Sequence, residues 1–197
     1  MSVRYSPVKW NHNKRVYDVI MTAGIAGYLT LFILVGKLAW SGSEAILLLR
    51  ALGTCGLLLL HVVLCIGPLA RLDRRFLPVL YNRRHLGVAT FLVGLAHGVL
   101  ATLYYHGFGN VNPFLSLLGT NTEYTSVSAF PFETLGVIAL LILFIMAATS
   151  HDFWQKNLSG SVWKSIHMLV YPAYALLIMH VALGALRAEG NVLYLGI

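Results

Sequence analysis

The chain has 197 residues, of which 58% are hydrophobic and only 11% are charged, and its mean hydropathy is +0.75. A soluble domain carries about 25% charged residues, so this composition excludes a soluble globular or nucleic-acid-binding domain, and the high hydrophobicity excludes a disordered chain. A membrane protein is the remaining class. The formal net charge of +7 then helps to assign the loops, because Lys and Arg collect on the cytoplasmic side of a membrane.

Five apolar runs are long enough, or nearly so, to cross a bilayer, which takes about 20 residues of helix. They predict an all-α polytopic transmembrane bundle with spans at residues 19–36, 51–70, 86–105, 134–150 and 165–185. The first run has no convincing cleavage site, so we expect a retained first helix rather than a signal peptide. Residues 191–197 resemble the opening of a sixth helix. We interpret residues 1–197 as a single transmembrane domain.

The basic residues predict the orientation of these spans. An N-terminus on the cytoplasmic side places eleven of the fourteen Lys and Arg residues in the cytoplasm: Arg4, Lys9, Lys14, Arg15, Arg71, Arg74, Arg75, Arg83, Arg84, Lys156 and Lys164. Only Lys37, Arg50 and Arg187 then lie outside. The positive-inside rule therefore predicts that residues 1–17 form a cytoplasmic segment and that residues 107–133 form one long external loop.

The sequence lacks the motifs of several cofactor classes. No CxxCH motif is present, which excludes covalent c-type haem. The two cysteines, Cys55 and Cys65, lie in one apolar run about 15 Å apart along a helix, too far to form a disulfide with each other. The sequence has no Rossmann fingerprint, and no polar stretch is long enough to form a domain that binds a nicotinamide or a flavin.

Histidines are the strongly polar residues of the predicted spans. His61 lies in the second span, His97 in the third, and His167 and His180 in the fifth, while His85 lies at the start of the third. Polar residues inside spans are costly and mark candidate functional sites. No Asp or Glu lies in a span core, which argues against a proton or cation pathway.

The depths of these histidines suggest how they pair. The third and fifth spans run in the same direction, so His97, about 12 residues in, and His180, about 15 residues in, reach similar depths. His167 lies about 20 Å further inward, too far for the same metal ion, and His61 lies within a turn or two of that level. Pairs of facing imidazoles without further ligands suit a haem b iron better than tetrahedral zinc. The alternative is that they only hydrogen-bond neighbouring helices.

Four stretches of the sequence resemble a known family. They are Arg83-Arg84-His85-Leu86-Gly87 followed by His97, Gly67-Pro-Leu-Ala-Arg71, Ala148-Thr-Ser150, and Trp163-Lys-Ser-Ile-His167-Met-Leu-Val-Tyr171 followed by His180. Over roughly residues 45–197 the chain resembles the ferric-reductase-like transmembrane domain. Within that family it is similar to the haem-binding membrane subunits of the bacterial periplasmic methionine sulfoxide reductase system.

The resemblance implies a six-helix bundle that carries b-type haem and passes electrons across the membrane. By matching position, His97, His167 and His180 would be axial ligands, with His97 opposite His180. Relatives with a second, inner haem have another histidine at the position of Arg83, so the partner of His167 is open. His61 and His85 are the candidates, and the alternative is a different ligand or no second haem; we favour His61 because of its depth.

The predicted function is a membrane b-type cytochrome of the bacterial inner membrane. Its bis-histidine haem, and more specifically two haems, would transfer electrons to or from a partner redox protein or a quinone. The chain would be an electron-transfer subunit rather than a complete enzyme, and residues 107–133 would dock an external partner. The alternatives are a stand-alone ferric-chelate reductase and a haem-free structural subunit of a membrane complex.

Overall fold

The structure is a computed structural model that describes residues 11–39, 42–119, 124 and 130–189, and the side chains of these residues up to 185. The described residues contain helices and turns but no strand, which confirms the predicted all-α class. The expected start of a sixth helix at residues 191–197 lies outside the described part of the chain.

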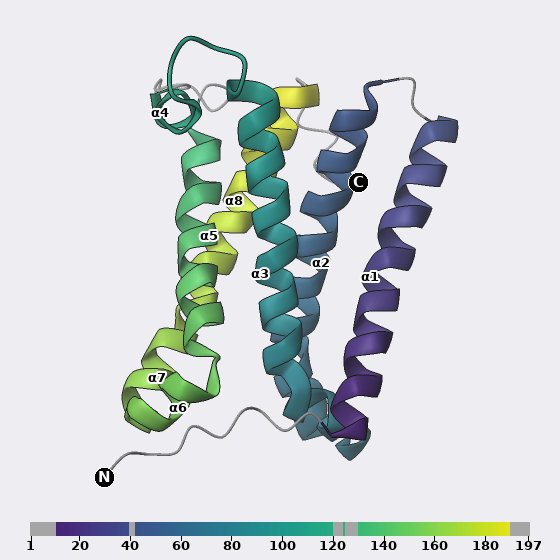
Figure 1. The fold of residues 1–197 in the computed structure, drawn as a ribbon, viewed down its shortest axis with the longest axis vertical. Coiled ribbons are helices and arrows are strands. Elements are labelled where there is room, and N and C mark those ends of the chain that lie inside the picture. The colour runs from purple at the N-terminus through teal and green to yellow at the C-terminus, as the bar shows by residue number, and fades with distance from the viewer. Residues whose placement is uncertain (1–10, 40–41, 120–123, 125–129, 190–197) are drawn as a thin grey trace.

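Long helices form an antiparallel bundle in which successive spans alternate in direction (Figure 1). The spanning helices are α1 His12–Ala39, α2 Glu44–Leu72, α3 Leu77–His106, α5 Phe132–Thr149, α7 Gly160–Met168 and α8 Val170–Glu189. The shorter elements are the 3-10 helix η1 Arg74–Phe76, α4 Pro113–Gly119 and α6 Asp152–Asn157.

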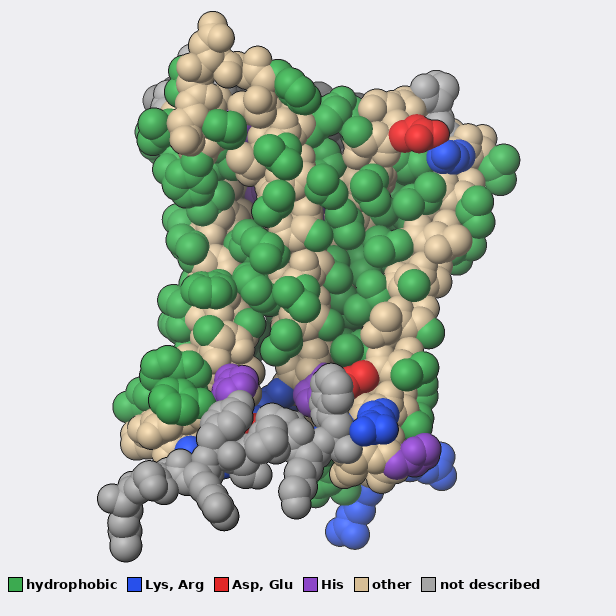
Figure 2. Space-filling model, viewed as in Figure 1, with side chains coloured by type: hydrophobic (Ala, Val, Ile, Leu, Met, Phe, Trp, Pro, Cys, Tyr) green, Lys and Arg blue, Asp and Glu red, His purple; other side chains and the backbone are tan. Residues whose placement is uncertain are grey.

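Five segments are long and apolar enough to cross a membrane, as the sequence predicted. Figure 2 shows hydrophobic side chains covering the visible face between the two ends of the bundle, with most of the visible Lys and Arg at the end where α1 begins. The chain is therefore a multi-pass membrane protein. The third span starts well before its predicted boundary, because α3 begins at Leu77 and carries Arg83 and Arg84 within the helix.

The fifth span is broken, which the sequence analysis missed. Helix α7 ends at Met168 and α8 begins at Val170, with the Leu169 amide donating to the Ile166 carbonyl at 3.1 Å. Pro172 explains the position of the break. It has no N–H to donate to the carbonyl four residues earlier, and its ring crowds that carbonyl. The break leaves His167 in the last turn of α7 and His180 in α8.

The bundle packs as two helix pairs, α2 with α3 and α5 with α8, and α1 lies at the edge beyond α2 (Figure 1). The buried cluster of Leu60, Leu143 and Ala173 joins α2, α5 and α8. Ala173 lies between His167 and His180 along the chain, so this apolar cluster separates the two histidine levels. None of the residues of α1 is buried.

The predicted external loop is partly helical. Helix α4 lies within residues 107–133, and the side chain of Asn112 accepts a hydrogen bond from the Phe114 amide at 3.0 Å at its start. The short helix begins at Pro113, and proline favours the first helical turn. Residues 120–123 and 125–129 of the same segment lie outside the described chain.

Candidate metal centre

His97 on α3 and His180 on α8 lie close together between the two helix pairs. The Nδ1 of His97 is 3.0 Å from the carbonyl oxygen of Leu49, and the Nδ1 of His180 is 2.8 Å from that of Phe132. A carbonyl oxygen can only accept, so each Nδ1 must carry the proton and donate it. The lone pair of each neutral imidazole therefore lies on Nε2, and neither Nε2 makes a hydrogen bond among the described residues.

The spacing of these two rings fits one iron. Their centroids are 6.4 Å apart and their planes are nearly perpendicular, at 81°. A metal–imidazole bond is about 2.0–2.1 Å long and the ring centre lies about one ångström beyond the nitrogen, so two imidazoles on opposite sides of one metal have centres about 6–6.5 Å apart. Perpendicular planes are compatible with this arrangement, because each ring can turn about its own metal–nitrogen axis.

The donor set also fits a macrocycle better than a bare metal ion. Among the described residues, no group of three or more His, Cys, Asp or Glu side chains is placed to hold a metal ion. Two imidazoles alone would leave a zinc ion short of ligands. They complete the coordination of a haem iron, which brings four nitrogens of its own.

His167 forms a second level of the bundle with an aromatic neighbour. Its ring stacks on Trp163 with centroids 3.8 Å apart and planes at 24°. Its Nδ1 donates to the Trp163 carbonyl at 3.0 Å, and its Nε2 lies 3.3 Å from the Ser150 hydroxyl. The Trp163 indole in turn donates to the Thr149 carbonyl at 3.2 Å. His167 therefore also has its lone pair on Nε2, and the Ser150 hydroxyl that faces this nitrogen donates its own proton to the Met146 carbonyl at 2.8 Å.

His61 faces α8 from α2. Its Nδ1 donates to the Leu57 carbonyl of its own helix at 2.8 Å, and its Nε2 is 2.9 Å from the Tyr174 hydroxyl. The hydroxyl must donate to this nitrogen, since Nδ1 holds the ring proton. His61 thus occupies the side of the bundle that also holds α8, but Tyr174 takes its lone pair.

His85 faces the opposite side of the bundle. Its Nδ1 lies 2.6 Å from the carboxylate of Asp18 on α1, and the ring of Tyr17 meets it edge-on, with centroids 6.5 Å apart. Helix α1 is separated from α5 and α8 by α2 and α3 (Figure 1). His85 therefore fastens α1 to α3 and does not point towards the helix that follows His167.

Arg84 closes the end of the bundle next to His167. Its Nη1 donates to the Ser150 carbonyl at 3.2 Å, to the Asp152 carboxylate at 3.0 Å and to the Gln155 side chain at 2.9 Å. These bonds join α3 to the turn between α5 and α6. Ser150 belongs both to this cluster and to the contact with His167, so the cluster fixes the surroundings of that ring.

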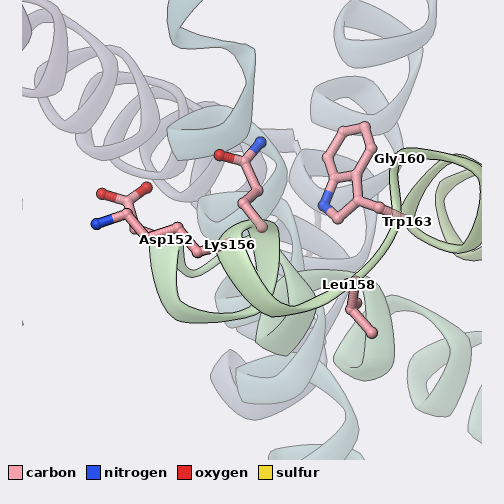
Figure 3. A pocket seen from close by; sticks show the side chains of 6 residues that line it. Asp152, Lys156, Leu158, Gly160 and Trp163 are labelled. Carbon is pink, nitrogen blue, oxygen red and sulfur yellow. The ribbon is translucent and has the colours of Figure 1, made fainter. Parts of the chain in front are cut away.

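A shallow pocket of ≈ 300 Å³ lies at the same end (Figure 3). It is lined by the side chains of Asp152, Gln155, Lys156, Leu158 and Trp163, together with Gly160. Trp163 therefore contacts the pocket as well as the ring of His167.

The remaining described histidines differ from the candidates. His106 is only 9% exposed and lies between the Ser116 hydroxyl, 3.0 Å from its Nδ1, and the Glu133 carboxylate, 3.7 Å from its Nε2. His151 accepts the Phe153 amide at the start of α6. Its Nδ1 therefore carries the lone pair, which is the opposite tautomer.

The sequence analysis missed three side chains that now accompany the candidate ligands: Asp18, Ser150 and Tyr174. Asp18 offered a signal, since a carboxylate next to an apolar run is costly unless it is paired. Ser150 and Tyr174 are ordinary residues of a span, and only the packing of α5 and α8 assigns them a partner.

The fold and the site together define a class: a multi-pass helical membrane protein with paired imidazoles between its helices. Residues 52–178, more than half of the chain, match the family described as ferric reductase like transmembrane component. The chain belongs to this family, which confirms the resemblance found in the sequence.

Curated relatives are about 30% identical to the chain over the residues that align. The protein of Bordetella pertussis is 30% identical over 167 residues, which cover 84% of this chain and 75% of that protein. The proteins of Herminiimonas arsenicoxydans and Ralstonia nicotianae are 33% and 31% identical over 78% and 66% of this chain. All three are named protein-methionine-sulfoxide reductase heme-binding subunit MsrQ. The match spans only 55% of the Ralstonia protein and 65% of the Herminiimonas protein.

Proposed function

We propose that this protein is a membrane b-type cytochrome that transfers electrons through the bilayer, with one haem b held by His97 and His180. The observation that carries the proposal is the pair of carbonyl-anchored rings with centroids 6.4 Å apart. Metal-binding histidines characteristically donate their other ring N–H to a backbone carbonyl or a carboxylate. When bound, haem supplies a one-electron couple, and the chain supplies the axial nitrogens and an apolar surrounding.

The relatives support this function. They are named as heme-binding subunits of a protein-methionine-sulfoxide reductase. We infer that this chain also binds haem as a subunit, with a separate redox protein as its partner. The segment of residues 107–133, which includes α4, is the proposed docking region because it follows the end of α3 nearest to His97 and includes Phe132, the residue that anchors His180.

A second haem is proposed at the level of His167, with His61 as its other ligand. His61 faces the α8 side of the bundle, whereas His85 is bound to Asp18 on the α1 side. The distance from His167 to His180, about 20 Å along the chain, requires two separate cofactors. Two haems at these levels would give electrons a route through a hydrocarbon core about 30 Å thick.

The pocket beside Trp163 is the proposed place of electron entry. A quinol headgroup or a donor protein at this pocket would contact the indole that stacks on His167. Gln155 and Lys156 offer hydrogen-bond donors to the oxygens of a quinone. Replacing Trp163 by Leu should slow reduction by a soluble quinol analogue, whereas replacing Trp154, which does not line the pocket, should not.

We place this end of the bundle on the cytoplasmic side of a bacterial inner membrane. The basic side chains at positions 71–84 and in the α6–α7 region lie at this end. At the other end, Lys37 forms an ion pair with Glu44, with 2.7 Å between Nζ and Oε1. The positive-inside rule then gives a cytoplasmic N-terminus.

A reduced-minus-oxidised optical spectrum of the purified protein tests the central proposal. The wild type should show a b-type signal, and His97→Ala and His180→Ala should each lose one haem while remaining inserted in the membrane. His151→Ala is the matched control, because that side chain caps α6 outside the predicted spans. A full haem content in either ligand variant refutes the assignment, and a wild type without haem supports a structural subunit.

A further inference from the structure

The two outer histidines are anchored in the same way by two different helices. His97 donates to the carbonyl of Leu49 on α2, and Gly53 is four residues further along that helix. His180 donates to the carbonyl of Phe132 on α5, and Gly136 is four residues further along that helix. In both cases a glycine follows the accepting carbonyl at the interval of one helical turn.

This interval matters because of the geometry of a helix. Side chains point back towards the N-terminus, so the side chain of one residue lies over the carbonyl of the residue four before it. Helix α2 shows this directly at the next position, where the Thr54 hydroxyl bonds the Arg50 carbonyl at 2.7 Å. A glycine at this place leaves the carbonyl uncovered, so a donor from a neighbouring helix can reach it.

The space beside each glycine is filled by the histidine itself. A Cβ at Gly136 would lie 2.8 Å from Nδ1 and 2.9 Å from Cε1 of His180. A Cβ at Gly53 would lie 3.1 Å from Cε1 and 3.2 Å from Nδ1 of His97. An alanine at either place would therefore push against the atom that makes the anchoring hydrogen bond, more severely at Gly136.

The inner histidines are anchored differently. His61 and His167 donate to the carbonyls of Leu57 and Trp163, which lie four residues earlier on their own helices. Such a bond holds a ring against its own helix. A bond to a neighbouring helix instead fixes the ring in the space between helices, where a shared ligand must lie.

We propose that Gly53 and Gly136 are positioning residues for the outer ligand pair. Each opens a notch, consisting of the glycine and the carbonyl four residues before it, that holds one imidazole in the Nδ1–H form with Nε2 available to a metal. This inference rests on the proposed haem at His97 and His180. It adds which residues of α2 and α5 make these two side chains competent as ligands.

The test replaces each glycine by alanine in the full-length protein and measures haem affinity and spin state. Gly136→Ala and Gly53→Ala should weaken the outer haem by about tenfold or more, as loss of an outer-shell partner does at metal sites, and should convert part of it from low to high spin. The effect should be larger for Gly136→Ala. A thermal transition in detergent monitors folding, and alanine by itself favours the helix at both sites.

Two matched controls use glycines without such contacts. A Cβ at Gly56, one turn from Gly53 on α2, would meet Val93 at an ordinary 3.7 Å, and Gly24 on α1 has nothing within 4 Å. Gly56→Ala and Gly24→Ala should keep a wild-type spectrum. Wild-type haem affinity and spin state in both notch variants would overturn the inference, as would equal losses in the notch and control variants. If Gly136→Ala does not accumulate, Gly53→Ala carries the same test.

A measurement on haem-free protein separates this inference from the proposed function. ¹⁵N NMR of labelled histidine should show the Nδ1–H form for His97 and His180 in the wild type and a mixture of tautomers in the notch variants. A wild type that binds no haem but shows these tautomers would refute the proposed function and leave the notches intact. A haem-binding wild type whose notch variants keep the pure Nδ1–H form would refute the notches alone.

Discussion

Replacing Tyr174 by Phe should strengthen haem binding at the inner level. The Tyr174 hydroxyl lies 2.9 Å from Nε2 of His61, the nitrogen that would bind iron. A haem bound by His61 must therefore displace this hydroxyl. Phe keeps the ring, which packs against the cluster of Leu60, Leu143 and Ala173, but removes the competing donor.

The magnitude follows from the one hydrogen bond that is lost. A neutral hydrogen bond contributes about 1 kcal/mol net, and a difference of 1.4 kcal/mol changes an equilibrium constant about tenfold. The inner haem should therefore bind about fivefold more tightly in Tyr174→Phe, while the outer haem is unchanged. Haem titration into haem-free protein, followed by the b-type absorbance, measures both affinities.

Tyr171→Phe is the matched control, since Tyr171 is 58% exposed on the same helix. Its haem affinities should equal those of the wild type. If Tyr174→Phe leaves the inner affinity unchanged or lowers it, His61 does not bind the inner haem, and a single binding phase in the wild type would end the two-haem proposal.

Three further experiments test the surroundings of the site and the orientation of the chain in the membrane. His85→Ala and Asp18→Asn should each leave the haem content unchanged and weaken the contact of α1 with α3. Faster proteolysis near residue 18 would detect the weaker contact. Loss of a haem in His85→Ala would instead make His85 the ligand. Arg84→Met should lower the free energy of unfolding by about 2–3 kcal/mol, since it removes two hydrogen bonds and an ion pair that is partly screened, whereas Arg75→Met, with a side chain 92% exposed, should change little. In intact cells, an impermeant thiol reagent should label Phe108→Cys, which replaces a residue 94% exposed, but not Arg74→Cys; the reverse pattern contradicts a cytoplasmic N-terminus.

Hydropathy predicted the number and order of the spans but not their ends. The predicted spans were bounded by charged residues, so the third span was expected to begin after Arg83 and Arg84, although α3 begins at Leu77. Those arginines remain helical because Arg84 is satisfied by three acceptors near α6. The break at Leu169 follows from Pro172, a local signal that an average over an apolar run conceals.

The pairing of His97 with His180 was predictable because depth along a helix depends only on residue count. The environment of each ring was not, because hydrogen-bond partners depend on which helix lies opposite. The expected proximity of His61 and His167 illustrates this limit: counting placed them at similar depth, and the structure gives each a partner of its own, Tyr174 and Ser150.

This difference divides the candidate ligands into two kinds. His97 and His180 have Nε2 unbonded among the described residues, and their ring centroids lie at the spacing expected around one iron, so no hydrogen bond of Nε2 would have to break on binding. At the inner level the Tyr174 hydroxyl donates to Nε2 of His61, so an inner haem held by His61 must break this bond, and its apparent affinity falls by the fraction of molecules in which the bond is open. If both proposed haems are present, the outer one should therefore bind first, and Tyr174→Phe should reduce the difference between the two affinities.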